Sequence, residues 1–449
     1  METDQLPAQR VYRLPSARLP RLRTLVARTW LVIVCTLALA GLGSAALPAS
    51  EARLRMLGMY TAGYGFDLLG WEVDALGEKL RDWAAQPGAE YSPTQQAEVV
   101  RRYMARADQM RLAEEEMNRV LSEGGTGALA GAARMQRELQ ELRRQQQAER
   151  PAAEQIIQRQ VGQELREAGF GLGGRVMPPV QFTFTEPPKK LIVSPRDRIT
   201  TLYSRMLTPE ISLEEIERKE QAIQGEQDVS AYVTHIGGLG AFPTMVVDRA
   251  SLPWVLSTVA HEWVHNYLAF FPLGWSYFAS GEMTTLNETV AEIVGNEIGH
   301  RALQRHYLEP AQPETPDAPA TGEAEASAPL SELLGLPEPL PFDFRSAMRE
   351  TRLTVDLLLA QGRVDEAEAY MEERRQFFVE NGVPLRVLNQ AYFAFHGSYG
   401  TSAASTSPIG PKLDELRSLT PSLRDFLHAV RTFTAPDDLD RALDEWRGR

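Results

Sequence analysis

The sequence predicts a mainly α-helical chain with a small mixed β-sheet, that is, an α+β fold. Apolar residues recur at helical spacing through much of residues 51–168 and 342–449. Short β-prone runs, punctuated by proline and glycine, lie between residues 181 and 247. A chain of 449 residues with 43% hydrophobic composition can bury a sizeable core. One large folded unit with appendages is therefore expected.

Charge and cysteine content exclude several classes of protein. The formal net charge is −13, with arginines crowded before residue 30, which argues against a general nucleic-acid binder. The single cysteine, Cys35, lies in an apolar segment, so disulfides and cysteine-ligated metals are excluded from the folded part. Any transition-metal site must then use the seven histidines and the carboxylates.

The N-terminal residues have the pattern of a membrane anchor. Residues 1–28 form a basic leader, and residues 29–50 carry no charge and suit a transmembrane helix. The positive-inside rule keeps the leader cytoplasmic and predicts a single-pass protein whose remaining chain is extracytoplasmic. A cleaved signal peptide, giving a secreted protein, is the alternative, but the basic leader is long for one.

Residues 51–168 are expected to form a helical region. A glycine-rich break at residues 124–127 predicts a helical hairpin. The charged runs at residues 111–119 and 136–150 lack a sustained apolar heptad. Solvated surface helices are therefore favoured over a coiled coil.

The pattern changes to short strands within residues 169–307. Residues 181–185 and 190–194 are β-prone and joined through two prolines, which predicts the start of a small sheet. Helical spacing returns over residues 198–223, and residues 244–247 are a further predicted strand. Because proline cannot donate to a ladder, Pro243 indicates an edge strand.

The C-terminal part begins after a predicted flexible insert at residues 308–341, which holds eight of the 29 prolines. Beyond it, the C-terminal helical region of residues 342–449 contains amphipathic helices at residues 344–361, 364–380 and 384–395. Gly362 and Gly382 occupy the capping positions between them.

The residues that indicate chemistry are His261, Glu262 and His265, which form an H-E-x-x-H motif in the apolar stretch 254–271. On a helix, histidines four residues apart project from one face and can bind one Zn²⁺. Glu262 then points beside them, toward a metal-bound water. The motif also occurs by chance, so a second feature is needed.

That second feature is an acidic helix downstream. Thr285 is expected to cap a helix over residues 286–306, on which Glu288, Glu292 and two glycines form one stripe. The opposite side of this predicted helix is apolar.

The order His261-Glu262-x-x-His265 followed by Asn287-Glu288-x-x-x-Glu292 resembles the gluzincin metallopeptidases, among them thermolysin-like enzymes and the aminopeptidase N family. The resemblance covers roughly residues 230–300 and implies a zincin-like catalytic core in residues 169–307. It implies Glu288 as the third zinc ligand, with Glu292 holding a histidine by hydrogen bond and Asn287 beside them. The 22 residues between His265 and Glu288 indicate a longer inter-helix loop than usual.

A weaker likeness lies around residues 389–399, which look similar to the C-terminal helix of predicted bacterial aminopeptidases. It implies that Tyr399, or His396, donates a hydrogen bond to the developing oxyanion. Ordinary packing is the alternative for both residues. Among the other histidines, His300 shares the Glu288 helix and is a further candidate ligand.

The expected function is that of a membrane-anchored zinc-dependent peptidase, with Glu262 as general base and a peptide or protein as substrate. Residues 244–247 would lie antiparallel to the extended peptide. Residues 237–241 stand where aminopeptidase N enzymes carry a Gly-Ala segment that ends in an acid, but no glutamate follows here. This modestly favours an endopeptidase and leaves an aminopeptidase open.

Two other functions compete with this one. The first is a membrane-tethered helical scaffold, in which residues 97–168 and 344–395 bind partners and the metal site is vestigial. The second is a non-peptidase zinc hydrolase or a structural zinc protein, which would leave Glu262 idle and therefore ranks last.

Overall fold

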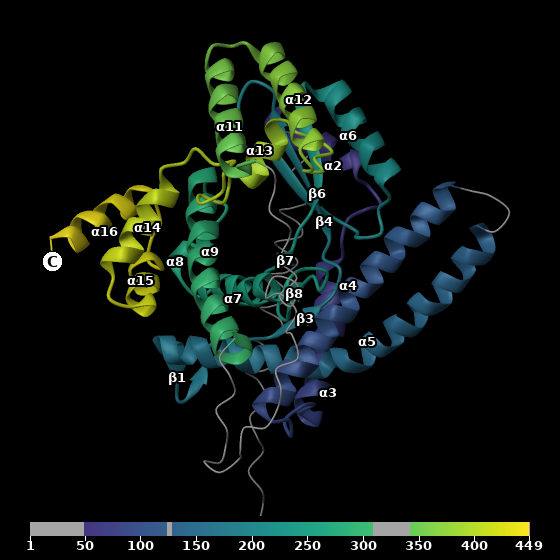
Figure 1. Cartoon of the computed structure of the whole chain (residues 1–449). Helices are drawn as coiled ribbons and strands as arrows, with labels where there is room; N and C mark the ends of the chain where they lie inside the picture. Colours follow the sequence, from purple (N-terminus) through teal and green to yellow (C-terminus); the bar gives the residue numbers. More distant parts are fainter. Residues whose placement is uncertain (1–48, 124–127, 309–341, 449) are drawn as a thin grey trace, which may run out of the picture. The chain divides into compact units, whose positions relative to one another are not determined.

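The computed structural model describes residues 49–123, 128–308 and 342–448 (Figure 1). The chain divides into two compact units, residues 1–57 and 58–449, and the fold below is that of the second. It is mostly helical with small sheets, which confirms the α+β prediction. The expected leader, most of the expected anchor and nearly all of the expected insert lie outside the described residues. Within the described ranges, no helix is both long and apolar enough to span a bilayer.

The region before the sheets is helical, as predicted. Its helices are α3 (Leu68–Ala85), α4 (Pro93–Glu123) and α5 (Ala128–Leu165), while α2 (Ala49–Tyr60) belongs for the most part to the first unit. Helices α4 and α5 run antiparallel, since Arg102 binds Glu149 at 2.9 Å while Arg143 binds Glu114 at 2.6 Å. The predicted hairpin is thus confirmed, although its glycine-rich turn lies outside the described residues.

The base of this hairpin is buried, so the prediction of solvated surface helices holds for most of the charged runs but is wrong for the base. Val100, Tyr103, Ile156 and Val161 are at most 1% exposed and belong to the main core. They follow helical spacing, but the charged runs around them mask the apolar face in the sequence. Glu154, also buried, pairs with Lys79 of α3 and accepts from Thr183 and Phe184, so it ties the hairpin to its neighbours.

One three-stranded sheet lies next to the hairpin. It contains β3 (Phe182–Phe184), β8 (Thr244–Val246) and β7 (Gly238–Leu239), in the order β3-β8-β7. Strand β8 is parallel to β3 and antiparallel to β7. The prediction that residues 244–247 form an edge strand is therefore wrong. Pro243 is tolerated because it precedes the ladder, whose first N–H, that of Thr244, donates to Gln181 at 2.9 Å.

The second sheet is antiparallel, in the order β5-β4-β6. Its strands are β4 (Lys189–Pro195), β5 (Tyr203–Leu207) and β6 (Val229–His235), so the two predicted early strands belong to different sheets. The helix predicted over residues 198–223 is wrong in its first half, because β5 pairs with β4 there. Helix α6 (Leu213–Gln227) begins only after Ser212, which accepts a hydrogen bond from the Glu215 N–H.

Helices α7 (Leu252–Leu268) and α9 (Gly281–Leu303) pack closely, with short α8 (Pro272–Trp275) between them. Helix α9 begins one turn before the predicted start, because Ser280 rather than Thr285 caps it by accepting from the Met283 N–H at 3.1 Å. The regular helix ends at Leu303 and a π-turn (Gln304–Leu308) follows.

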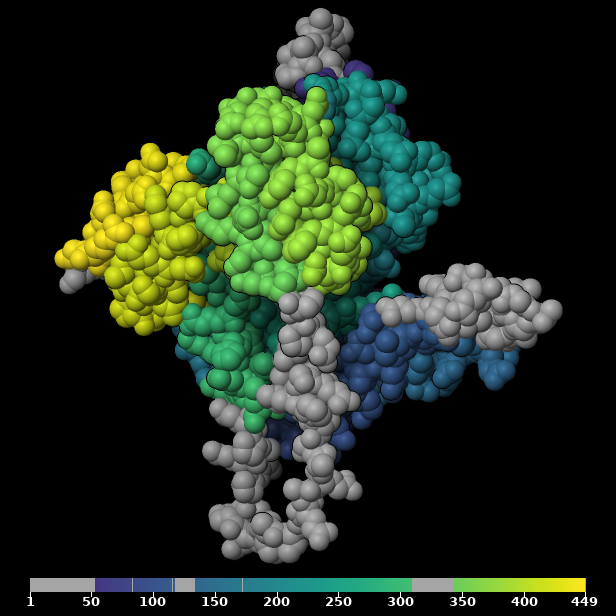
Figure 2. Space-filling model, turned by 45° about the horizontal axis from the view of Figure 1, so that its top comes forward, coloured from purple at the N-terminus to yellow at the C-terminus, as the bar shows by residue number. Residues whose placement is uncertain are grey.

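The C-terminal region is helical, and α11 and α12 lie side by side on the face seen in Figure 2. Its helices are α11 (Phe344–Ala360), α12 (Val364–Glu380), α13 (Gln390–His396), α14 (Ile409–Leu419), α15 (Leu423–Val430) and α16 (Asp437–Arg447). Gly362 and Gly382 adopt φ of +71° and +86° after α11 and α12, as the capping prediction requires. The third predicted helix starts late, at residue 390, where Asn389 caps α13.

Alanine at position 299 is expected to destabilise the fold. A Cβ on Gly299 would lie 2.4 Å from Ser257 Oγ and 2.6 Å from Ser257 Cα, so α7 and α9 would have to separate. Such overpacking typically costs about 1–3 kcal/mol. Urea denaturation of Gly299→Ala measures it, with Gly281→Ala as control, because nothing lies within 4 Å of a Cβ there. Equal stability of the two variants would contradict the close-packing argument.

Candidate metal centre

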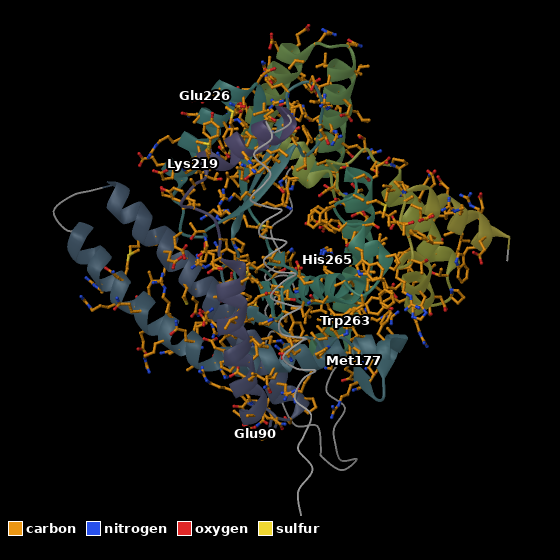
Figure 3. All side chains as sticks on the ribbon, turned by 180° about the vertical axis from the view of Figure 1, so that it is seen from behind. Glu90, Met177, Lys219, Glu226, Trp263 and His265 are labelled. Atoms are coloured by element: carbon orange, nitrogen blue, oxygen red, sulfur yellow. The ribbon has the colours of Figure 1, made fainter. Side chains whose placement is uncertain are left out.

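Three potential metal ligands converge where α7 and α9 pack together. His261 and His265 come from α7 and Glu288 from α9 (His265 is labelled in Figure 3). The two Nε2 atoms are 3.0 Å apart, and Glu288 Oε2 lies 3.5 Å from the first and 3.6 Å from the second. Tetrahedral Zn²⁺ with bonds of ~2.0–2.2 Å separates its ligand atoms by roughly 3.3–3.6 Å. The two Glu288 separations lie in this range, and the two imidazoles, at 3.0 Å, would have to move apart by a few tenths of an ångström to bind Zn²⁺. Within the described part of the chain, no other set of three such side chains fits a metal.

Asn287 sets the orientation of His265. Its Oδ1 lies 2.9 Å from His265 Nδ1, and its Nδ2 donates to the Leu273 carbonyl at 3.2 Å. The Leu273 contact fixes the amide so that its oxygen faces the ring and accepts from the Nδ1–H. In the neutral ring Nε2 is the unprotonated nitrogen and is directed toward His261 and Glu288, which is the tautomer that a metal ligand requires.

The electrostatics of the site favour an added positive charge. Burial alone would lower the pKa of His265, but the Glu288 carboxylate outweighs it and raises the pKa to about 9. Burial likewise opposes ionisation of Glu288, yet the two histidines hold its pKa well below the usual range. The pKa of Glu262 is raised by burial, which the histidines only partly offset. A carboxylate with a raised pKa is a competent proton acceptor near neutral pH.

Two tyrosine hydroxyls lie near the same carboxylate. Burial and the Glu288 charge act on the Tyr399 hydroxyl and raise its pKa, and the Tyr399 ring centroid is 6.3 Å from that of His261. Tyr277, which the sequence patterns did not indicate, donates to Glu288. Burial and the Glu288 charge raise the pKa of both tyrosines, so both stay protonated and can donate. The alternative donor, His396, instead stacks on Tyr392 at 4.2 Å, and burial lowers its pKa to about 4.

Glu292 differs from its expected role. It accepts a hydrogen bond from Thr401, rather than the expected one from a histidine ligand. The reason is that the loop carrying Tyr399 packs on α9, where Gly400 N–H donates to Thr289 Oγ1 at 2.8 Å. Glu292 thus holds the Tyr399 loop on α9. His300 is exposed on the same helix and lies outside the metal-ligand group.

Bare backbone covers the Glu262 carboxylate. A Cβ at Gly238 would lie 2.4 Å from Glu262 Oε1, and one at Gly240 would lie 3.3 Å from His265 Cβ. Only glycine at position 238 allows β7 to approach the carboxylate this closely. The glycine-rich run noted in the sequence therefore has a steric function beside Glu262.

Lys190 of β4 adds a cation near the site. Its Nζ lies 5.5 Å from the centroid of the Phe395 ring, and that ring is 6.3 Å from the Tyr399 ring. Burial lowers the pKa of Lys190, while the Glu288 charge acts in the opposite direction. The residue was missed because nothing distinguishes it, in sequence, from the neighbouring Lys189.

Comparison with known proteins gave no match to a protein family model, to a curated protein or to a solved structure.

Removal of the Asn287 side chain is expected to weaken zinc binding about 10–100-fold, as is typical when a hydrogen bond that orients a ligand is lost. Competition with a chromophoric chelator would measure the affinity of Asn287→Ala. The matched control is His300→Ala, a substitution at an exposed histidine of the same helix, which should bind zinc like wild type. Equal affinity in both variants would show that Asn287 does not orient His265.

Zinc affinity is expected to rise with pH between about 6 and 8. Because the pKa of His265 is about 9 in the metal-free protein, a proton occupies this ligand below that pH and the metal must displace it. One displaced proton corresponds to a change of about tenfold per pH unit. Chelator competition at several pH values measures the slope, and a flat profile would contradict the raised pKa.

Proposed function

We propose that this chain is a zinc-dependent peptidase of the gluzincin type, anchored to a membrane by residues 29–50 with its catalytic part outside the cytoplasm. The observation that carries the proposal is the convergence of His261, His265 and Glu288, with the Glu262 carboxylate beside them. Two neutral imidazoles and one carboxylate are a typical set for catalytic zinc, because they leave a fourth position open.

A zinc ion bound by these three residues would polarise a scissile carbonyl and lower the pKa of a water molecule. With the metal bound, the Glu262 carboxylate is placed to serve as the base that would accept a proton from water and return it to the leaving amine. Its burial, at 7% exposure, keeps the carboxylate poorly solvated and raises its pKa, which suits both transfers. Tyr399 is the proposed donor to the developing oxyanion, and Tyr277 is a second hydroxyl at the same carboxylate.

Strand β7 is the proposed binding edge for an extended peptide. Within the described residues it pairs with β8 alone, so its other edge is free to accept a further strand. Residues 244–247, which were expected to pair with the peptide, lie in the centre of the sheet, so the proposed pairing strand is Gly238–Leu239 instead. The nearby Phe242 N–H donates to Glu72 of α3 at 3.1 Å, so a carboxylate does stand beside the segment that lacks one in sequence.

The scaffold alternative has less support. The base of the α4–α5 hairpin is packed in the core and is not available for a partner. An exposed apolar stripe on α3 is the feature that most favours it, and it consists of Leu69, Val73, Leu76 and Leu80.

Glu262→Gln is expected to lower peptide hydrolysis by about 10²–10⁴-fold while zinc content stays near one ion per chain, since Glu262 is not a ligand. Casein and aminoacyl-anilide hydrolysis by the purified chain measure activity and separate endopeptidase from aminopeptidase. Glu282→Gln, at an exposed position of α9, is the matched control. His265→Ala and Glu288→Ala should lose both zinc and activity. Zinc retained by Glu288→Ala would overturn the ligand assignment.

A further inference from the structure

A cavity of about 490 Å³ lies between the helical hairpin and the β3-β8-β7 sheet. Its walls include Met110 of α4, Gln146 of α5 and Trp254 of α7. Residues 185–187, 235–237 and 247–250 complete the lining. This volume is within the range of sites that take small ligands or single side chains. The hairpin that forms one wall is not part of the metal centre.

The cavity adjoins the proposed peptide-binding edge. Gly237 lines it and packs against Trp254, where a Cβ would lie 2.3 Å from the indole. The next residue, Gly238, begins β7 and lies against the Glu262 carboxylate. An extended peptide paired with β7 would therefore pass from the general base to the cavity mouth within a few residues.

The charged groups of the cavity are mostly carboxylates. Asp248 accepts hydrogen bonds from Tyr103 Oη at 3.0 Å and from Gln146 Nε2 at 2.9 Å, both neutral donors. The one cation in the lining, Arg249, is bound to Glu114 at 3.1 Å. Burial raises the pKa of Asp248, and its hydrogen bonds and the Arg249 charge offset this only in part, which indicates a carboxylate whose loss of water is incompletely compensated.

The remaining titratable groups do not reverse this balance. Glu186 adds a second carboxylate at the exposed rim. The pKa of His235 is lowered by burial and by Lys189, so this ring is neutral at neutral pH. Apolar surface from Met110 and Trp254 suits the methylene stem of a long side chain, while Asp248 suits its charged end.

We propose that this cavity is a substrate subsite for a basic side chain, lysine or arginine, of a peptide bound along β7. The inference rests on the proposed peptidase function and adds a substrate class to it. Asp248 would pair with the ammonium or guanidinium group, and Glu186 would attract it from the rim.

The test compares peptides that carry arginine with matched peptides that carry citrulline, which has the same shape and no charge. The arginine or citrulline is placed in turn at the first, second and third positions on each side of the cleaved bond. With the wild-type chain, we expect kcat/KM to favour arginine by at least about tenfold at one position, as for a buried charged pair. Asp248→Asn should bring that ratio close to one, and Glu186→Gln should lower it less. Because both peptides are cleaved by the same variant, a general loss of activity does not change the ratio of their kcat/KM values.

Two controls separate this proposal from the proposed function. Asp365→Asn, at an exposed aspartate whose side chain lies outside the cavity, should keep the wild-type ratio. Binding of the same peptide pairs is measured by fluorescence anisotropy in the Glu262→Gln background, where cleavage is not required. Preferential binding of arginine peptides, lost on Asp248→Asn, without any cleavage by wild type would retain the subsite and refute the peptidase. Cleavage with no arginine preference at any position, or a preference that survives both cavity variants, would refute the subsite.

Discussion

The close approach of α7 and α9 is the constraint on which the candidate site depends. Gly295 and Gly299 let the two backbones meet, since a Cβ at Gly295 would lie 2.9 Å from the Cβ of His261. Without that approach, the carboxylate of Glu288 could not lie about 3.5 Å from both imidazoles. The apolar core around the pair, including Val259, Val264 and Val290, supplies the burial that holds the helices together.

Burial of the site makes its charges strongly interdependent. One acidic ligand and two basic rings share a poorly hydrated space, with a second carboxylate, Glu262, beside them. Opposite charges hold Glu288 ionised, whereas Glu262 lacks an equal compensation and takes up protons more readily. Tyr277 extends this network by donating to Glu288 as a neutral donor, and the Tyr399 hydroxyl lies within the influence of the same carboxylate. Separate tasks for the two carboxylates thus follow from their surroundings.

Local patterns predicted what lies within one helix. The spacing of His261 and His265 follows from the helical repeat, and resemblance to a known family pointed to Glu288. Groups brought in by tertiary packing had no such signal: Tyr277 comes from a connector and Lys190 from an unremarkable strand. Strand order failed for the same reason, because β7 is two residues long and only its pairing with β8 shows which strand is central.

The bare backbone above Glu262 restricts how this chain can vary. Any side chain at Gly238 would displace the Glu262 carboxylate, so a substitution there would disturb Glu262 before it disturbed the backbone. The α4 and α5 residues that line the cavity, such as Met110 and Gln146, lie outside the metal-ligand group. The candidate metal group and the cavity thus share no residue, so each can be altered by its own substitutions.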